Sequence, residues 1–347
     1  MGCADGRLAR RRANQVEALV DRSEFDPWHY DRLPWESSNI SLKGAAEEFI
    51  AAKTLTCRPK TILAYGTALR GLLKTLPRGF PLAALAPKHV VAYVLASEVS
   101  DATRRHRYRH IRTFVRWARE SSLLSDDRNP LKGIRLPKEQ KTLPAFLGPD
   151  DLDRVITAID AWTELQASSG RGRPGENVWL KDVVIVAAYT GLRLGELAAA
   201  QWNWVDLSNR TLSVRHTNGF STKSGRERCV PLAGPAFEVV SRMADERDPN
   251  TALPTDPLFA GPRGNGINPS RTSKRFKHFV RLAKLDDRLH FHSLRHSCGS
   301  MLALAGVPSV VIAEVLGHAS TATTAIYVHA AGQHVREAME KAFSEVS

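Results

Sequence analysis

The stretch from Phe291 to His329 leaves few choices of local structure, because apolar residues at helical spacing are interrupted by residues that end helices. Pro308 prevents the first helix of this stretch from continuing. A second helix, with Ser309 as its cap, has room for only two turns before Gly317. The pattern therefore predicts short helices joined by tight turns, with a third helix from Thr321 to His329.

The same stretch carries polar side chains that suit one kind of chemistry. His292 and Arg295 lie three residues apart on one helix face, His318 follows the second helix, and Tyr327 comes nine residues later. Tyrosine is a poor nucleophile at neutral pH because its pKa is about 10, so it needs cations that stabilise its charge. Arginine binds phosphate oxygens with a planar, permanently charged group. Two arginines could stabilise a five-coordinate phosphorus without a metal, so we expect a second one elsewhere.

Arg193 meets this expectation. It lies in the sequence TGLRLGEL, residues 190–197, directly after the apolar run Val183 to Tyr189. Glu196 follows three residues later, so its carboxylate is placed to orient the guanidinium group at a helix start. A purely structural ion pair is the alternative, and it is compatible with catalysis because an oriented guanidinium is better preorganised.

TGLRLGEL, HSLRH, LGH and a tyrosine nine residues later, in this order, resemble the motifs of the tyrosine recombinase family, the phage integrase and Xer-like site-specific recombinases. The resemblance covers about residues 40 to 345. It implies an enzyme that cleaves and rejoins DNA through a 3′-phosphotyrosine intermediate, without cofactor or metal. The residues that match the family's catalytic positions are Arg193, Lys223, His292, Arg295, His318 and Tyr327. His296 and His329 flank the motifs and match no catalytic position.

Lys223 is predicted to lie at a hairpin. Trp204 to Leu207, Thr211 to His216 and Arg226 to Pro231 alternate like short strands, and Lys223 lies between the last two. A departing 5′ oxygen needs a proton, which a nearby ammonium group can supply. In the family a lysine on this hairpin acts as the general acid. Lysines at hairpin tips otherwise commonly serve only solubility.

Each candidate residue also has a structural interpretation. Tyr327 could be a half-buried aromatic residue with a hydrogen-bonded hydroxyl, and His292 and His318 could cap helices or bond within the core. At the level of function, the alternatives are a DNA-relaxing enzyme like the type IB topoisomerases and a DNA-binding protein without catalysis.

The charge of the chain predicts a polyanionic partner. The net charge is +13 and the pI is about 9.8. Residues 1–141 hold 26 lysines and arginines against 15 acids, whereas the remainder holds 23 against 21. The excess is therefore concentrated in the first part of the chain.

Two predicted helices carry basic stripes. Asp101 is expected to cap a helix from Ala102 to Glu120, and a second basic helix is expected from Arg271 to Lys284. A stripe of basic side chains without acidic residues is suited to binding successive phosphates of a DNA backbone. An ordinary exposed basic helix is the alternative. The predicted DNA-binding residues are Arg105, Arg109, Arg112, Arg116, Lys274, Lys277 and Arg281.

The predicted fold is mainly α-helical with a small antiparallel β-sheet. We expect an N-terminal arm at 1–38, a helical core-binding domain of the SAM-like type at 39–136, a linker at 137–147, and an α+β catalytic domain of the DNA breaking-rejoining type at 148–347. The catalytic domain should end in an amphipathic helix around Val335 and Phe343, which packs either on its own domain or on a neighbouring protomer.

The resemblance also implies partners. They are double-stranded DNA with specific recombination sites, further copies of the chain in a tetramer on DNA formed from monomers in solution, and an accessory factor that bends DNA or sets direction. No apolar run approaches the roughly 18 residues of a membrane span, and the four cysteines lack the spacing of zinc or disulfide frameworks. We therefore expect a cytoplasmic protein, associated with the nucleoid and independent of membranes.

Overall fold

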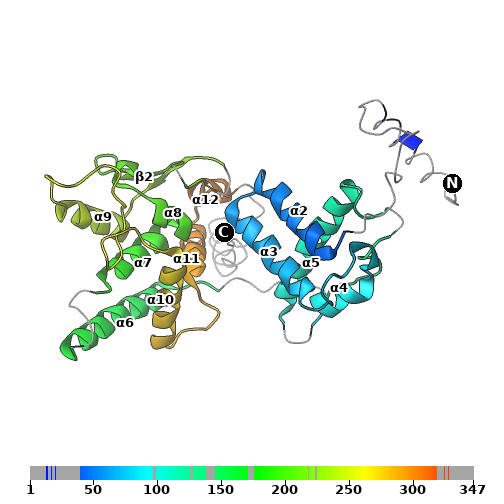
Figure 1. Ribbon diagram of the computed structural model, residues 1–347. Helices are drawn as coiled ribbons and strands as arrows, with labels where there is room; N and C mark the ends of the chain where they lie inside the picture. The colour runs from blue at the N-terminus through cyan, green and yellow to red at the C-terminus, as the bar shows by residue number, and fades with distance from the viewer. Residues whose placement is uncertain are drawn as a thin grey trace, which may run out of the picture. The chain divides into compact units, whose positions relative to one another are not determined.

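Figure 1 shows the computed structural model of the chain. The residues that it describes are 13, 14, 17, 20, 40–96, 99–125, 128–137, 145–170, 176–217, 219–222, 225–318, 324 and 327. The chain divides into two compact units, residues 1–141 and 142–347. The predicted helix beyond Tyr327 and most of the predicted arm and linker lie outside the described residues. The domain bounds and roles given above stay predictions.

The first unit is helical in its described residues. Its elements are α2 (Leu42–Thr54), α3 (Pro59–Leu73), the 3₁₀ turn η1 (Leu82–Ala84), α4 (Pro87–Val94) and α5 (Asp101–Glu120). Phe49 of α2 lies at the centre of the core, where its ring meets the edges of Tyr65, Phe114 and Trp117 at centroid distances of 5.1, 5.5 and 5.4 Å. Because aromatic rings favour such edge contacts, α2, α3 and α5 are held together at this residue.

One local expectation for the first unit was wrong. Asp101 does not cap α5, because its carboxylate is bound by Arg104 at 2.8 Å and Ser100 accepts the hydrogen bond of the Thr103 amide instead. Leu63 of α3 is 64% exposed. It lies off the face of α3 that buries Leu69 and Leu72 at helical spacing.

The second unit combines helices with one small sheet. Its elements are α6 (Pro149–Ser168), α7 (Val178–Thr190), α8 (Leu194–Ala199), the 3₁₀ turn η2 (Trp202–Trp204), β1 (Val205–Asp206), β2 (Thr211–Val214), β3 (Arg228–Pro231), α9 (Pro235–Asp245), α10 (Pro269–Leu282), α11 (Phe291–Leu304) and α12 (Ser309–Leu316). The strands are antiparallel in the order β1-β2-β3, with Leu212 opposite both Val205 and Val230. The predicted fold class, mainly α-helical with a small antiparallel sheet, is confirmed.

The predicted boundaries in this unit need correction. The strands are shorter than expected because Trp204 belongs to a 3₁₀ turn and pairing stops after Val214. Helix α10 begins at Pro269 and ends before Lys284, whose φ of 54° is not helical. Ser309 is the first residue of α12, and the cap position is taken by Pro308 in an extended conformation.

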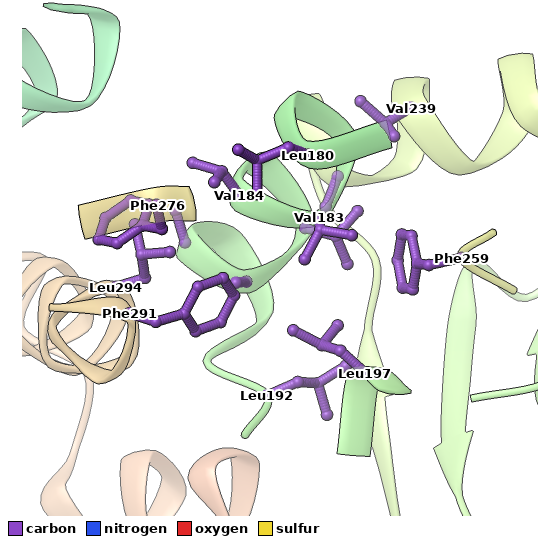
Figure 2. Packing of buried hydrophobic residues seen from close by; sticks show 14 of the residues in the cluster. Leu180, Val183, Val184, Leu192, Leu197, Val239, Phe259, Phe276, Phe291 and Leu294 are labelled. Atoms are coloured by element: carbon purple, nitrogen blue, oxygen red, sulfur yellow. The ribbon is translucent and has the colours of Figure 1, made fainter. Parts of the chain in front are cut away.

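Helix α7 is the centre of the second unit, because it contacts α6, α8, α9, α10 and α11. Figure 2 shows its apolar side chains between those of the neighbouring elements. Val184 lies on the side of Phe276 of α10 and Leu294 of α11, whereas Val183 lies on the side of Phe259 and of Val239 of α9. This packing fixes the end of α7, from which the candidate site begins. Within the described residues, no helix has the length and apolar character needed to cross a membrane.

Replacement of Phe49 by alanine is expected to destabilise the first unit by about 3–5 kcal/mol, because a fully buried ring in contact with three others is lost. Urea unfolding of the full chain, followed by circular dichroism and tryptophan fluorescence, measures the change. Leu63→Ala is the control, since this side chain is exposed, and should leave the unfolding curve nearly unchanged. Equal effects of the two substitutions would contradict the packing described here.

Candidate active site

The turn after α7 places Arg193. Helix α7 ends at Thr190, and Gly191 follows in the left-handed conformation with φ 64°. A Cβ atom at Gly191 would lie 2.2 Å from Leu316 of α12, so only glycine allows this turn to pack against α12. The turn brings Arg193 to the cap position of α8.

The guanidinium group of Arg193 is fixed from two sides. Its Nη1 donates to Glu196 Oε1 at 2.9 Å, and its Nη2 donates to the carbonyl oxygen of Gly317 at 3.0 Å. The backbone N–H of Arg193 also donates to Glu196 Oε2 at 2.9 Å. The ion pair expected from the spacing is therefore present, and Arg193 keeps a partly exposed side chain.

Arg228 at the start of β3 is a site residue that the sequence motifs did not reveal. Its Nη2 and Nη1 donate to Glu196 Oε2 and Oε1 at 2.7 and 3.1 Å, and its Nε donates to the carbonyl of Val315 at 3.0 Å. Glu196 is thus held between two arginines, 2% exposed. Burial alone would raise the pKa of Glu196, but the bonds from Arg228 and Arg193 outweigh it and the pKa is lowered.

Arg295 is the most buried cation of the site, at 2% exposure. Its Nη1 donates to the carbonyl oxygen of Gly191 at 2.8 Å, whereas its Nη2 is buried without a hydrogen-bond partner among the described residues. Burial and the nearby charge of Arg193 lower the pKa of Arg295 to about 10. A buried N–H group of a cation without an acceptor is costly, so this atom indicates a place for an anion.

Tyr327 lies against the same helix. Its side chain is 3% exposed, and its ring rests on Gly299 of α11, where a Cβ atom would come within 2.6 Å of the ring. Its hydroxyl oxygen lies 3.0 Å from Nδ1 of His296. Burial raises the pKa of the phenol, and the charge of Arg295 offsets only part of this effect.

The two predicted histidines lie beside Tyr327 and His296. The ring of His318 stacks on Tyr327, with centroids 6.2 Å apart and planes at 16°, and its Nδ1 lies 2.9 Å from Thr324 Oγ1. The ring of His292 meets the ring of His296 edge-on at 4.9 Å. Burial first, and then neighbouring cations or imidazoles, lower the pKa of each of these three histidines to about 4. All three are therefore neutral at physiological pH in this structure.

The structure thus gathers most of the predicted residues from distant parts of the chain. Arg193 and Arg295 both influence the pKa of His292, His318 and Tyr327. Lys223 lies outside the described residues. His296, which the motif comparison left out, contacts the tyrosine hydroxyl; its place one helical turn before Gly299 was the available sequence signal. The catalytic roles of all these residues stay predictions.

The predicted DNA-binding arginines of α5 differ in their surroundings. Arg109 and Arg112 are exposed, Arg116 pairs with Glu120 at 2.8 Å, and Arg105 donates to the carbonyl oxygen of Pro137. A cleft of about 430 Å³ beside this helix is lined by both Arg112 and Arg116. The cationic face of α5 is therefore accessible within the first unit.

On α10, Lys274 is exposed, whereas Lys277 and Arg281 both pair with Asp287, at 3.0 and 2.8 Å. Their hydrogen bonds lower the pKa of Asp287 to about 2. These two cations are thus partly neutralised within the unit. In the parts of the chain that the structure describes, no three histidine, cysteine or acidic side chains are grouped so that they could hold a metal ion.

The phage integrase family matches residues 148–334, more than half of the chain. The chain belongs to the phage integrase family. Tyrosine recombinase XerC of Alcanivorax borkumensis is 32% identical over 236 residues, which are 67% of this chain and 70% of that protein. Tyrosine recombinase XerC of Mycobacterium bovis is 28% identical over 311 residues, 87% of this chain and 99% of the other.

Solved structures of integrases share the fold of this family member. The Tn1549 transposon integrase in complex with transposon right end DNA has a TM-score of 0.67 at 18% identity, covering 87% of this chain and 99% of that one. A lambda integrase tetramer bound to a Holliday junction has a TM-score of 0.67 at 16% identity, covering 94% and 87%.

As a member of the phage integrase family, the protein is a tyrosine recombinase, a site-specific DNA recombinase that cleaves and rejoins DNA strands. The predicted family and enzyme class are confirmed. The comparisons give no support to the topoisomerase-like enzyme or to the DNA-binding protein without catalysis.

Replacement of Arg228 by leucine is expected to lower the free energy of unfolding by about 3–5 kcal/mol at neutral pH, because the buried carboxylate of Glu196 loses its two-point partner. Arg228→Lys keeps the positive charge but cannot bind both carboxylate oxygens as a guanidinium group does, so its free energy of unfolding should fall by less. Urea unfolding measures both changes. Arg288→Leu, which removes an exposed ion pair with Asp286, is the control and should have little effect.

The loss of stability caused by Arg228→Leu should be smaller at acidic pH. The folded-state pKa of Glu196 is lowered, so its contribution to stability is present above the unfolded value and is lost as pH falls through the folded value. The wild-type and Arg228→Leu curves of stability against pH should therefore converge at low pH. Parallel curves would contradict the assignment of Arg228 as the main partner of Glu196.

Proposed function

We propose that this recombinase cleaves each DNA strand through Tyr327, forming a 3′-phosphotyrosine and a free 5′ hydroxyl. The observation that carries this proposal is the free Nη2 donor of the buried Arg295, in a site that also holds Arg193 and the tyrosine hydroxyl. A non-bridging phosphate oxygen would supply the missing acceptor.

In the proposed reaction the phenol oxygen of Tyr327 forms a bond to phosphorus while the bond from phosphorus to the 5′ oxygen breaks. Arg193, Arg295, His292 and His318 would bind the phosphoryl oxygens, and Glu196 would orient Arg193. Fixed donors of this kind stabilise the charge that develops in the transition state because they need no reorganisation. We propose Lys223 as the general acid that protonates the departing 5′ oxygen.

The phosphodiester energy is retained in the protein link, so the proposed steps use no ATP, cofactor or metal ion. The 5′ hydroxyl of a partner strand reverses the reaction and restores a phosphodiester. Two such rounds, through a four-way junction, would exchange two duplexes.

The proposed assembly is a tetramer on two specific sites in double-stranded DNA, formed from monomers. The lambda integrase relative was solved as a tetramer on a Holliday junction, which supports this arrangement. We further propose an accessory DNA-bending or directionality factor, and a cytoplasmic location at the nucleoid where the substrate is found. The helix predicted after Tyr327 would link protomers or pack on its own domain.

Covalent capture tests the nucleophile. A library of nicked duplexes with randomised central sequence is incubated with the protein, and SDS-resistant adducts are recovered and sequenced to obtain a cleavable site. Tyr327→Phe should abolish the adduct, because the attacking oxygen is removed. Tyr189→Phe, a partly exposed tyrosine of α7, should retain it. An adduct of undiminished yield with Tyr327→Phe would refute this role.

The DNA-binding role of α5 predicts a change in salt dependence. Each of Arg109→Gln and Arg112→Gln should weaken binding to any duplex similarly and reduce the slope of log affinity against log salt by about one, because one phosphate contact is lost. Fluorescence anisotropy with the captured site and an unrelated duplex provides the slopes. Arg78→Gln, an exposed arginine in a turn of the same unit, is the matched control. Slopes that stay unchanged in both Arg109→Gln and Arg112→Gln would refute the proposed contacts of these arginines with DNA phosphates.

A further inference from the structure

The proposed reaction requires a group that takes the proton of the attacking phenol, and the tyrosine hydroxyl already touches one. His296 Nδ1 lies 3.0 Å from the oxygen of Tyr327. The ring of the same tyrosine rests on Gly299, which lies three residues further along α11 and therefore on the same face. The helix thus places a glycine under the ring and a hydrogen-bonding ring nitrogen beside its hydroxyl.

The other two imidazoles of the site are less well placed for this proton. His318 directs its Nδ1 to Thr324, and its ring lies stacked on the tyrosine. His292 faces the edge of His296. Among the described residues, His296 makes the hydrogen bond to the phenol.

We propose that Nδ1 of His296 accepts the phenolic proton of Tyr327 during strand cleavage. The O–H bond breaks and an N–H bond forms while the phenol oxygen bonds to phosphorus; the 5′ oxygen leaves with the proton of the general acid. The inference rests on the proposed function, in which Tyr327 is the nucleophile. When the strand is rejoined, the same proton returns from His296 to the departing tyrosine.

The electrostatics of the pair agree with this role. Burial, with His290 and Arg295, lowers the pKa of His296 to about 4, so the imidazole is neutral and has a free lone pair when its other nitrogen carries the hydrogen. The charged and titratable groups around it are His290 at the cap of α11, His292 and Arg295 within α11, His318 after α12, and the facing Tyr327.

In the absence of DNA the proton stays on oxygen, because the pKa of the phenol is raised while that of the imidazole is lowered. A bound phosphate would bring negative charge, which raises the pKa of a nearby imidazole and makes it a stronger base. Proton transfer would therefore accompany bonding to phosphorus and would not precede it.

His296→Asn tests the proposal on the captured nicked duplex. The asparagine side-chain oxygen replaces Nδ1 as an acceptor, so it retains the hydrogen bond but does not take up the proton. The single-turnover cleavage rate should fall about 10²- to 10⁴-fold. It should also rise by about tenfold per pH unit from neutral to alkaline pH, since ionisation of the phenol replaces the missing base, whereas the wild-type rate stays nearly flat.

A second variant guards against an effect of misfolding. Added imidazole should restore part of the cleavage rate of His296→Ala, by filling the space of the lost side chain, and should restore nothing in Tyr327→Phe. His278→Asn, an exposed histidine of α10 away from this cluster, is the matched control and should keep the wild-type rate and pH profile. Thermal melting and DNA binding of all variants are measured in parallel.

The outcomes separate the two proposals. A wild-type rate in His296→Asn would reduce His296 to a positioning residue, and a faster rate would make the hydrogen bond a restraint on the tyrosine; either result overturns the inference. Both leave the proposed function intact if Tyr327→Phe forms no adduct. An adduct with Tyr327→Phe would instead overturn the proposed function itself.

Discussion

The buried carboxylate of Glu196 is the interaction on which the geometry of the site depends. It binds Arg193 from the turn before α8 and Arg228 from β3, and those two arginines in turn bind the carbonyl oxygens of Gly317 and Val315 at the end of α12. One acid therefore joins elements that are far apart in the sequence. A buried charge pair adds little stability by itself, but it defines one arrangement of its partners because the alternatives leave a charge unpaired.

The site is built with more positive than negative charge. Three guanidinium groups, those of Arg193, Arg228 and Arg295, surround one carboxylate, and the three imidazoles nearby are neutral. Mutual repulsion and the unsatisfied donor of Arg295 make the empty site electrostatically unfavourable. The apolar packing around α7 supplies the stability that keeps it assembled (Figure 2). In the proposed reaction a DNA phosphate would relieve the repulsion, so substrate binding and preorganisation would act in the same direction.

Sequence patterns predicted the fold class and the helix ends that glycine and proline determine, because such residues act locally. Arg193 and Glu196 could be paired from their spacing for the same reason. The roles of Arg228 and His296 could not be predicted, since each acts through a partner brought close only by folding. Arg228 lies outside the motifs, and His296, although it is the last residue of HSLRH, matches no catalytic position. The caps of α5 and α12 were misassigned by one residue: Ser100, next to Asp101, caps α5, whereas at α12 the cap position falls on Pro308, whose side chain accepts no hydrogen bond.

Arg295, His296 and Gly299 all belong to α11, within little more than one helical turn. The guanidinium group, the imidazole and the glycine under the aromatic ring therefore belong to a single rigid body. A shift or tilt of this helix against its neighbours would move the three residues together and keep the spacing among them. A one-residue insertion within α11 ahead of Arg295 would rotate the whole set by about 100° relative to the start of the helix. The spacing among these three residues is thus fixed by the helix itself, whereas the remaining groups of the site come from other elements.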